Sequence, residues 1–311
     1  MKVQFDGVSL DLGSHTGPNT FAASLARGLY ESGHSVELTH HGADISLVFI
    51  EPSGRQLADR VCQRIDGIWF SSKQFYTHNS NIKAQYLTAN AVIYQSEFDK
   101  QMITKWFGAT KNGFIVRNGT DVKPVTQFVT PNLKKIRSSH DKVFVCSASW
   151  HGQKRLAQNV ELFMHLREIY SQERCCLIVL GQPDWMTPDP DIFWMGHQPL
   201  EVCTEIYSMA NWMIHLAWCD HAPNTVVHAL SQGTPVICSE VGGTKELVEG
   251  FGVVLTEQPY DFQLYDYDNP PSVDVTQLLK LPEKSALGQH CDISIERVVK
   301  DYVSVFESCL R

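Results

Sequence analysis

Positive charge is scarce in this chain of 311 residues, and its charge balance argues against nucleic acid as a partner. The chain has 26 Lys and Arg against 34 Asp and Glu, which gives a formal net charge of −8 at pH 7. Nucleic-acid binding depends on a broad surface of cations that neutralise phosphates. A small anion site can still exist within an acidic protein, so a small phosphate-bearing ligand stays open.

Long apolar runs are missing as well. No run reaches the roughly 18 apolar residues that a membrane-spanning helix needs, and the first residues, MKVQFDGVSL, lack the apolar core of a signal peptide. The nine cysteines include no C-x-x-C pair, which is typical of a reduced compartment. We therefore expect a soluble, cytoplasmic protein. Membrane contact stays open, because residues 20–90 contain no basic amphipathic helix.

Several common catalytic motifs are absent. The thirteen histidines form no H-E-x-x-H, and neither G-x-S-x-G nor the glycine-rich P-loop occurs. The acidic run DPD at 189–191 follows a proline in a polar loop, and we do not expect it to bind a metal. The sequence thus predicts no metal site and no resident cofactor, and it indicates neither a serine hydrolase nor a zinc protease.

Strands and helices alternate along both halves of the chain. In the first half, KVQFDG, DISLVFI, GIWF, AVIYQS and GFIVRNG are typical of strands, and stretches such as GRQLADRVCQR between them are typical of helices. Residues 121–141 have two prolines, mixed charge and no period, and are interpreted as a linker. The alternation then restarts at KVFVCSASW and continues to GVVLT. This alternation predicts parallel sheets covered on both faces.

The predicted fold class is α/β, with two Rossmann-like doubly wound domains facing across a cleft, because 311 residues exceed a comfortable single core. The expected domains are 1–125 and 126–291. The amphipathic helix at 292–311 is expected to pack back on the first domain. Ligands of such sheets bind beyond the carboxyl ends of the strands, so post-strand residues such as Gly181 are the candidates for a site.

Two strand-to-helix turns suit a phosphate. Gly17 precedes a helix whose first amides can hold an anion, although the glycine can equally serve only the turn. Lys154 and Arg155 open the corresponding helix of the second domain, where arginine can grip a diphosphate with two bonds and lysine adds a point charge. Basic side chains are unfavourable at the positive end of a helix, which favours a ligand over a solvated helix start.

Four blocks resemble a known family in order and spacing. They are VIYQSEFDKQMITKWFG, FIVRNGTD, SASWHGQKRL and the stretch from IYSMANWM to GGTKELV. Over about residues 13–255 and the C-terminal helix, the chain is similar to the glycosyltransferases of family 4 (group 1), which have the GT-B fold. The resemblance implies a nucleotide-diphosphate-sugar donor, a hydroxyl acceptor on a glycan, lipid or protein, hexosyl transfer with retention, and no required metal. The leaving phosphate is expected to take the proton of the acceptor.

The resemblance also implies a donor site. Lys154, with Arg155 beside it, would neutralise the diphosphate as its negative charge grows. Asp220 and His228 occupy the spacing of the family's E-x7-E element, whose carboxylates hold the sugar and the ribose. A neutral His228 can accept one hydrogen bond but not two. The other implied donor-binding positions are Gly17, Asn118, His151, Gly181, Asn224, Thr225 and Val226, and the last block is matched by Gly242, Gly243 and Glu246.

The acceptor is expected on the first domain, at Arg64, Asp66, Trp69 and His78, because sugars favour aromatic platforms with polar neighbours. The alternative is a variable loop at a strand end. His15, next to Gly17, is expected to face the sugar as a catalytic residue with Lys154 and Asp220.

His228 and His151 depart from the family's usual residues, Glu and Arg respectively. A catalytically silent GT-B module that binds a sugar nucleotide or a glycan therefore stays open. So does a sugar-nucleotide epimerase on the same fold.

Overall fold

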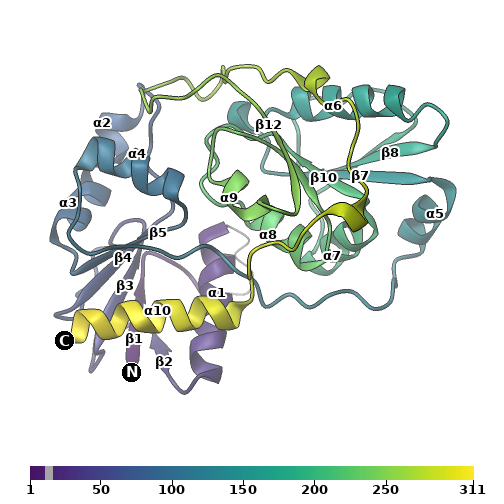
Figure 1. Ribbon diagram of the computed structural model, residues 1–311. Helices are drawn as coiled ribbons and strands as arrows, with labels where there is room; N and C mark the ends of the chain where they lie inside the picture. The colour runs from purple at the N-terminus through teal and green to yellow at the C-terminus, as the bar shows by residue number, and fades with distance from the viewer. Residues whose placement is uncertain (11–16) are drawn as a thin grey trace. The chain divides into compact units, whose positions relative to one another are not determined.

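The computed structural model describes residues 1–10 and 17–311, which form two compact units (Figure 1). The first unit consists of Met1–Asp121, Asp261–Asp266 and Asp292–Arg311, and the second of Val122–Tyr260 and Tyr267–Cys291. Each unit is built on one six-stranded parallel sheet. Within the described ranges, no helix is long and apolar enough to cross a membrane.

The first unit has the strand order β2-β1-β3-β4-β5-β6. Its strands are β1 (Lys2–Asp6), β2 (Ser35–Glu37), β3 (Ile45–Phe49), β4 (Val61–Ile65), β5 (Ala91–Tyr94) and β6 (Gly113–Ile115). Its helices are α1 (Gly17–Glu31), α2 (Phe75–His78), α3 (Ser80–Thr88), α4 (Glu97–Phe107) and α10 (Ile295–Leu310). Helices α1 and α10 pack together at Gly28, where a Cβ atom would lie only 2.7 Å from Val299 Cγ2. The predicted return of the C-terminal helix to the first domain is thus confirmed.

The second unit has the strand order β12-β11-β10-β7-β8-β9. Its strands are β7 (Lys142–Ser147), β8 (Cys175–Leu180), β9 (Ile192–Gly196), β10 (Trp212–His215), β11 (Val236–Ser239) and β12 (Gly252–Leu255). Its helices are α5 (Pro131–Ser139), α6 (Leu156–Ile169), α7 (Leu200–Met209), α8 (Asn224–Ser231) and α9 (Thr244–Val248). From β9 to β12 this is the order of a doubly wound Rossmann sheet, so the predicted α/β class with doubly wound parallel sheets is confirmed.

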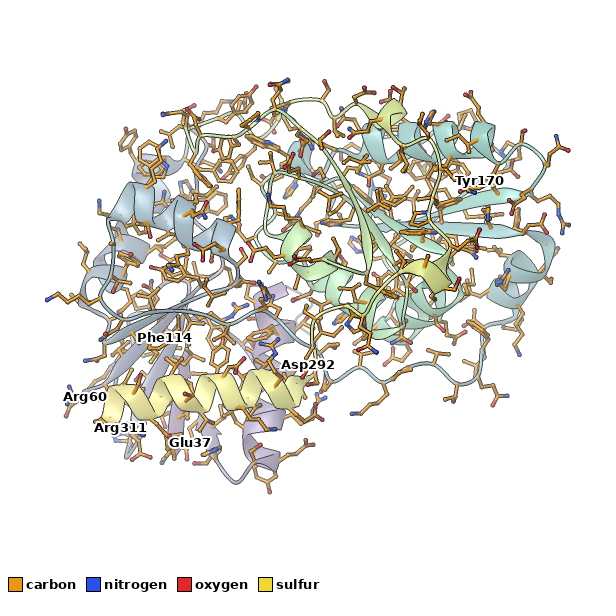
Figure 2. All side chains as sticks on the ribbon, viewed as in Figure 1. Glu37, Arg60, Phe114, Tyr170, Asp292 and Arg311 are labelled. Atoms are coloured by element: carbon orange, nitrogen blue, oxygen red, sulfur yellow. The ribbon has the colours of Figure 1, made fainter. Side chains whose placement is uncertain are left out.

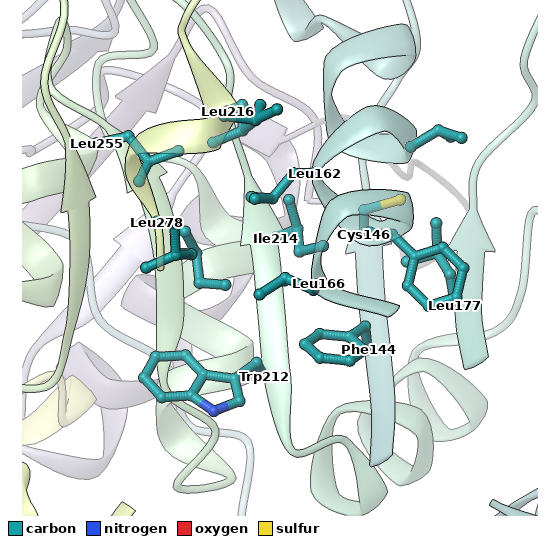
Figure 3. Packing of buried hydrophobic residues seen from close by; sticks show 14 of the residues in the cluster. Phe144, Cys146, Leu162, Leu166, Leu177, Trp212, Ile214, Leu216, Leu255 and Leu278 are labelled. Carbon is teal, nitrogen blue, oxygen red and sulfur yellow. The ribbon is translucent and has the colours of Figure 1, made fainter. Parts of the chain in front are cut away.

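A single apolar cluster joins the sheet of the second unit to α6 (Figure 3). Phe144, Leu177 and Ile214 project from three strands and are fully buried against Leu162 and Leu166 of the helix. Burying such side chains contributes about 1.5–3 kcal/mol each. This cluster fixes the helix against the sheet and thereby fixes the strand-to-helix turn that leads into α6.

One stretch of the first unit differs from its sequence prediction. The helix predicted for GRQLADRVCQR is wrong, because residues 61–65 form the strand β4, and the predicted strand GIWF is not a strand. The strand buries Gln63 and Arg64, and the Gln63 amide donates to Ile50 O at 2.7 Å and to Ile82 O at 3.1 Å. A buried strand with specifically bonded polar residues lacks the apolar pattern by which strands are identified from sequence. The predicted linker also contains a helix, α5.

Candidate functional site

The second sheet reverses its strand order between β7 and β10, which end at Ser147 and His215. Ligands of open α/β sheets bind outside the carboxyl ends of the strands at such a reversal. Lys154 lies on the segment that leaves β7, and Asp220 lies on the segment that leaves β10. Two residues predicted from sequence therefore belong to the two segments that flank the reversal.

Lys154 and Asp220 form an ion pair at this edge, and His215 bonds to the same carboxylate. The distance from Lys154 Nζ to Asp220 Oδ2 is 2.5 Å, and from His215 Nε2 to the same oxygen it is 3.0 Å. A carboxylate can only accept hydrogen bonds, so His215 carries its proton on Nε2. The Lys154 and Asp220 side chains are 16% and 13% exposed, and that of His215 is 3% exposed. The pair is thus shielded enough to be strong, yet reachable by a ligand.

The charge state of this cluster follows from its contacts. Burial alone would raise the pKa of Asp220, but the charge of Lys154 and the hydrogen bond from His215 outweigh it and hold this pKa below the usual range. Burial lowers the pKa of His151, and the charge of Lys154 lowers it further. At neutral pH the site therefore presents a charged Asp220 carboxylate and a neutral His151.

The backbone around Asp220 is held by the glycine pair of the last sequence block. Gly243 N donates to Asp220 O at 2.7 Å, and Cys219, in the left-handed region at φ 55°, donates to Val241 O at 2.9 Å. Gly242 has φ +148°, and a Cβ atom there would lie 2.9 Å from Asp220 O. Gly242 is therefore required by the close approach of two loops, and this approach positions the carboxylate.

A buried asparagine joins the two segments of the site. Asn159 Nδ2 donates to Lys154 O at 3.0 Å and to Arg155 O at 2.7 Å, and Asn159 Oδ1 accepts from Leu216 N at 3.2 Å. Leu216 directly follows His215. The carbonyl beside the lysine and the amide beside the histidine are thus tied to one side chain, which sets the spacing of the cluster.

The guanidinium of Arg155 is bonded within the protein. Its side chain is 1% exposed, and its Nη2 donates to Glu257 Oε2 at 2.6 Å and to Pro271 O at 2.5 Å. Its Nη1 donates to Leu216 O at 3.2 Å. The predicted role of Arg155 in donor binding is corrected, because a guanidinium bonded on this many sides within the protein holds the fold together.

Helix α8 begins four residues after Asp220. The predicted residues Asn224, Thr225 and Val226 form its first turn, in which Val226 N donates to Pro223 O at 3.1 Å. The start of a helix is the positive end of its dipole, which favours an anion there. His228 lies in the second turn and is half-buried. The E-x7-E spacing therefore consists of one loop residue and one helix residue, both in the second unit.

A pocket of about 370 Å³ adjoins the turn that carries Lys154. The residues that line it include Trp150, His151, Gly152, Arg155, Asp184 and Trp185. Planar rings beside a carboxylate and a histidine can hold a flat or a ring-shaped polar ligand. The predicted residue His151 is exposed and lines this pocket.

Gly181, also predicted to bind the donor, has a structural requirement of its own. Its φ is +96°, and a Cβ atom there would lie 2.0 Å from Ala148 O. Only glycine allows the loop after β8 to pass this close to the loop after β7.

In the first unit, Arg64 and Asn118 form a buried network. The Arg64 guanidinium contacts Asp66, donates to Asn118 Oδ1 at 3.1 Å and lies 4.2 Å from the centre of the Phe21 ring. Asn118 Nδ2 donates to Gln95 Oε1 at 2.8 Å. Arg64 and Asn118 are 1% and 2% exposed, so the predictions that their side chains bind acceptor and donor are corrected to a structural role.

The run after Asn118 also serves packing. A Cβ atom on Gly119 would lie 2.6 Å from Val298 Cγ2 and 2.7 Å from Ile293 O. The absence of a side chain at Gly119 therefore allows the start of α10 to pack closely against this segment. Gly17 begins α1 and is exposed. His15 lies outside the described residues.

Trp69 and His78 form an exposed aromatic pair on the first unit. Their ring centres are 5.1 Å apart, and Trp69 is 40% exposed. The buried Asn79 fixes the backbone of Trp69: its Oδ1 accepts from Trp69 N at 3.0 Å and its Nδ2 donates to Trp69 O at 2.6 Å. Asp66 is partly exposed nearby in sequence. These three predicted acceptor residues are accessible, unlike Arg64.

No group of three or more His, Cys, Asp or Glu side chains in residues 1–10 and 17–311 could hold a metal ion. The acidic run at 189–191 has a different partner. Arg167 bonds both oxygens of Asp189 at 3.0 Å and contacts Asp191 Oδ2 at 3.3 Å. This pairing explains why two carboxylates can lie so close together.

Three residues around the site were missed in the sequence. His215 ends the apolar run WMIH, and a polar residue at the last position of a buried strand is a usable signal for a site. Glu257, the partner of Arg155, lies in a stretch without period. Trp185 lies in a loop and has no pattern that marks it as lining a pocket.

No protein-family model matches the chain, and no curated protein matches it in sequence. Solved structures are similar. HepE from Anabaena, in complex with UDP and glucose, has a TM-score of 0.65 at 14% identity, over 99% of this chain and 100% of that chain. A glycosyltransferase from Rickettsia africae has a TM-score of 0.66 at 11% identity, over 100% and 98%. Sucrose-phosphate synthase from Thermosynechococcus elongatus has a TM-score of 0.62 at 13% identity, over 100% and 95%.

The solved structures that resemble this chain are glycosyltransferases with two Rossmann-like domains, the GT-B fold. At these low identities the likeness shows the fold alone. This chain has the same architecture, with a six-stranded parallel sheet in each unit. Any activity therefore has to be argued from its own site.

Proposed function

We propose that this protein is a retaining glycosyltransferase that moves a hexose from a nucleotide-diphosphate-sugar donor to a hydroxyl acceptor on a glycan, lipid or protein. The observation that carries the proposal is the cluster of Lys154, Asp220 and His215 at the reversal of the second sheet. The resemblance of the sequence blocks to family 4 supports the same reaction. So does the binding of UDP and glucose by HepE, which shares the fold.

Lys154 is proposed to stabilise the departing diphosphate. Its ammonium has three N–H donors, and one of them holds Asp220, so two can donate to phosphate oxygens. The first amides of α8 add a second source of positive potential. This supply of positive charge from the chain itself supports transfer without a required metal.

Asp220 is proposed to bind the donor sugar. Lys154 and His215 both bond to its Oδ2. Two bonds on one oxygen orient the carboxylate, and Oδ1 can then accept from a sugar hydroxyl. Because its pKa is held low, Asp220 accepts such a bond throughout the neutral range.

The proposed reaction is an exchange of bonds at the anomeric carbon. The bond from this carbon to the diphosphate oxygen breaks, and the nucleotide diphosphate leaves with the electron pair. The acceptor oxygen forms its bond on the same face, and its proton goes to the leaving phosphate. The role of the protein is then to stabilise charge and to position the two substrates.

The acceptor is proposed to bind on the first unit at Trp69 and His78, whose exposed rings offer a platform for a sugar. Asp66, which is accessible, would supply a hydrogen-bond acceptor. The nine free thiols support a cytoplasmic location, since they imply a reducing compartment.

A panel of nucleotide-diphosphate sugars, beginning with UDP-glucose, tests the proposal. We expect calorimetry to detect saturable binding of at least one donor, and mass spectrometry to detect release of the nucleotide diphosphate. Binding without release favours a silent module, which the neutral His151 also supports. Conversion of the donor sugar without an acceptor indicates an epimerase, and no binding across the panel contradicts both the transferase and the epimerase.

His228→Glu is expected to tighten nucleotide binding about tenfold, because a carboxylate can accept two ribose hydroxyl bonds where neutral His228 accepts one. His228 lies in the middle of α8, and glutamate is a good helix former, so the fold should tolerate the change. Calorimetry with the nucleotide diphosphate measures the effect. His228→Gln, whose side chain has the length of glutamate but no charge, is the control. Equal affinities of the wild type, His228→Glu and His228→Gln would mean that the spacing of Asp220 and His228 serves only packing.

A further inference from the structure

Two cysteines that are far apart in the sequence meet in the first unit. Cys62 lies on β4 and Cys309 lies in the last turn of α10, and their Sγ atoms are 3.4 Å apart. Cys62 is fully buried, whereas Cys309 is half-buried at the edge of the unit. Figure 2 shows Arg60, which precedes β4, and Arg311 near the C-terminal end of α10.

The contact is held in register by the residues around it. On α10, Phe306 and Tyr302 are fully buried about one and two turns before Cys309, respectively, on the same face of the helix. On β4, Cys62 and Arg64 share the face that meets this helix, since side chains two apart point the same way. Well-packed aromatic residues therefore hold the two sulfurs in contact.

The sulfurs are close enough to be joined. A disulfide has an S–S distance of about 2.05 Å, so the sulfurs must approach by about 1.4 Å from their present 3.4 Å. Small rotations about the Cα–Cβ bonds can supply a movement of this size.

The two thiols differ in reactivity. The hydrogen bond between them lowers the pKa of Cys309, and the charge of Arg60 acts in the same direction. The same hydrogen bond raises the pKa of Cys62, and burial raises it further. A thiolate is the nucleophile in cysteine oxidation, so the more exposed Cys309 is suited to react with the oxidant first. The buried Cys62 is then suited to attack the oxidised Cys309 and form the disulfide.

We propose that Cys62 and Cys309 form a dithiol site that reacts with hydroperoxides, and that its oxidation ties α10 covalently to β4. With hydrogen peroxide, the Cys309 thiolate attacks one peroxide oxygen, the O–O bond breaks, and hydroxide leaves and is protonated to water. Cys309 is then a sulfenic acid, two electrons more oxidised. The Cys62 sulfur attacks Cys309 Sγ, the S–S bond forms and the S–O bond breaks. The departing hydroxide takes the Cys62 proton as a second water.

The disulfide would close a loop that contains most of the chain. Residues 62 to 309 include the whole of the second unit. Cross-linking a long loop restricts the unfolded state, so the oxidised first unit should resist unfolding more than the reduced one. This site lies outside the proposed transfer machinery, and its failure would leave the proposed function unaffected.

The experiment uses the full chain, reduced and then treated with a small molar excess of hydrogen peroxide. We expect the number of free thiols to fall from nine to seven, and peptide mapping to find Cys62 linked to Cys309 with a mass loss of two hydrogens. Dithiothreitol should restore both thiols. The oxidised protein should melt several degrees higher than the reduced protein.

Cys309→Ser should abolish the linkage and the rise in Tm while leaving the fold intact, because Cys309 is only half-buried. Cys203→Ser, at a cysteine of similar exposure on α7, is the matched control and should behave like the wild type. Over-oxidation of Cys309 while Cys62 keeps its thiol would overturn the proposal. So would a different disulfide forming first.

Discussion

Lys154→Ala is expected to lower donor turnover by about 10²- to 10³-fold. The ammonium is the positive charge closest to Asp220, at 2.5 Å, and the proposed leaving group becomes more negative as its bond breaks. An interaction that strengthens only in the transition state affects kcat more than KM. Steady-state kinetics with the donor identified by the binding panel should therefore show a large fall in kcat and a small change in KM.

Two variants separate the charge of Lys154 from its effect on the fold. Lys154→Arg keeps the charge but places it on a planar group, so we expect an intermediate rate. Asp220→Asn keeps the shape of the carboxylate and removes its charge, so it tests whether the ammonium needs a charged partner. If Lys154→Ala turned over the donor as fast as the wild type, the proposed role of this residue would be wrong.

The fold was predictable because its signals are local. Strands such as CCLIVL are continuous apolar runs, and the helices between them have a clear period, so the two parallel sheets follow from the pattern. Strand order depends on which strands pair in the folded protein, so it was not predicted. The segment Asp261–Asp266 belongs to the first unit, and no local sequence pattern indicates that the chain returns there. β4 was missed because two of its buried residues, Gln63 and Arg64, are polar.

The site was predictable in part for the same reason. Lys154 and Asp220 follow strands, and that placement is visible in the sequence. The sequence does not show whether the side chain of a basic residue points toward solvent or into the protein. Lys154 and Arg155 are neighbours, yet the turn between η1 (Gly152–Lys154) and α6 puts Arg155 in the left-handed region, at φ 51°. The two side chains consequently enter different environments.

The contact of His215 with Asp220 could not be predicted from the spacing of the two residues in the sequence. His215 is five residues from Asp220, and between them Cys219 turns the chain back with positive φ. Positive φ at a non-glycine residue costs of order 1 kcal/mol or more, so the surrounding bonds must hold it. The bonds between residues 219–220 and the glycine pair at 242–243 do so. The carboxylate is thus positioned by a strained turn on one side and by glycines on the other.

Arg155→Met is expected to reduce the free energy of unfolding of the second unit by about 3–5 kcal/mol, the usual cost of removing one partner from a buried ion pair. The Glu257 side chain, which is 2% exposed, would lose this partner and retain the hydrogen bond from the amide of Val241, at 3.0 Å. Chemical denaturation followed by tryptophan fluorescence measures the change, because five of the seven tryptophans lie in this unit.

The double variant Arg155→Met with Glu257→Leu is expected to recover much of this loss, because it removes both charges and leaves apolar groups of similar size. Arg174→Met is the matched control: Arg174 and its partner Asp141 have side chains 65% and 45% exposed, and such surface pairs contribute about 0–1 kcal/mol. If Arg155→Met were as mild as Arg174→Met, Arg155 would not be the residue that holds the site's loops together. Its predicted role in binding the donor would then deserve a direct test by calorimetry.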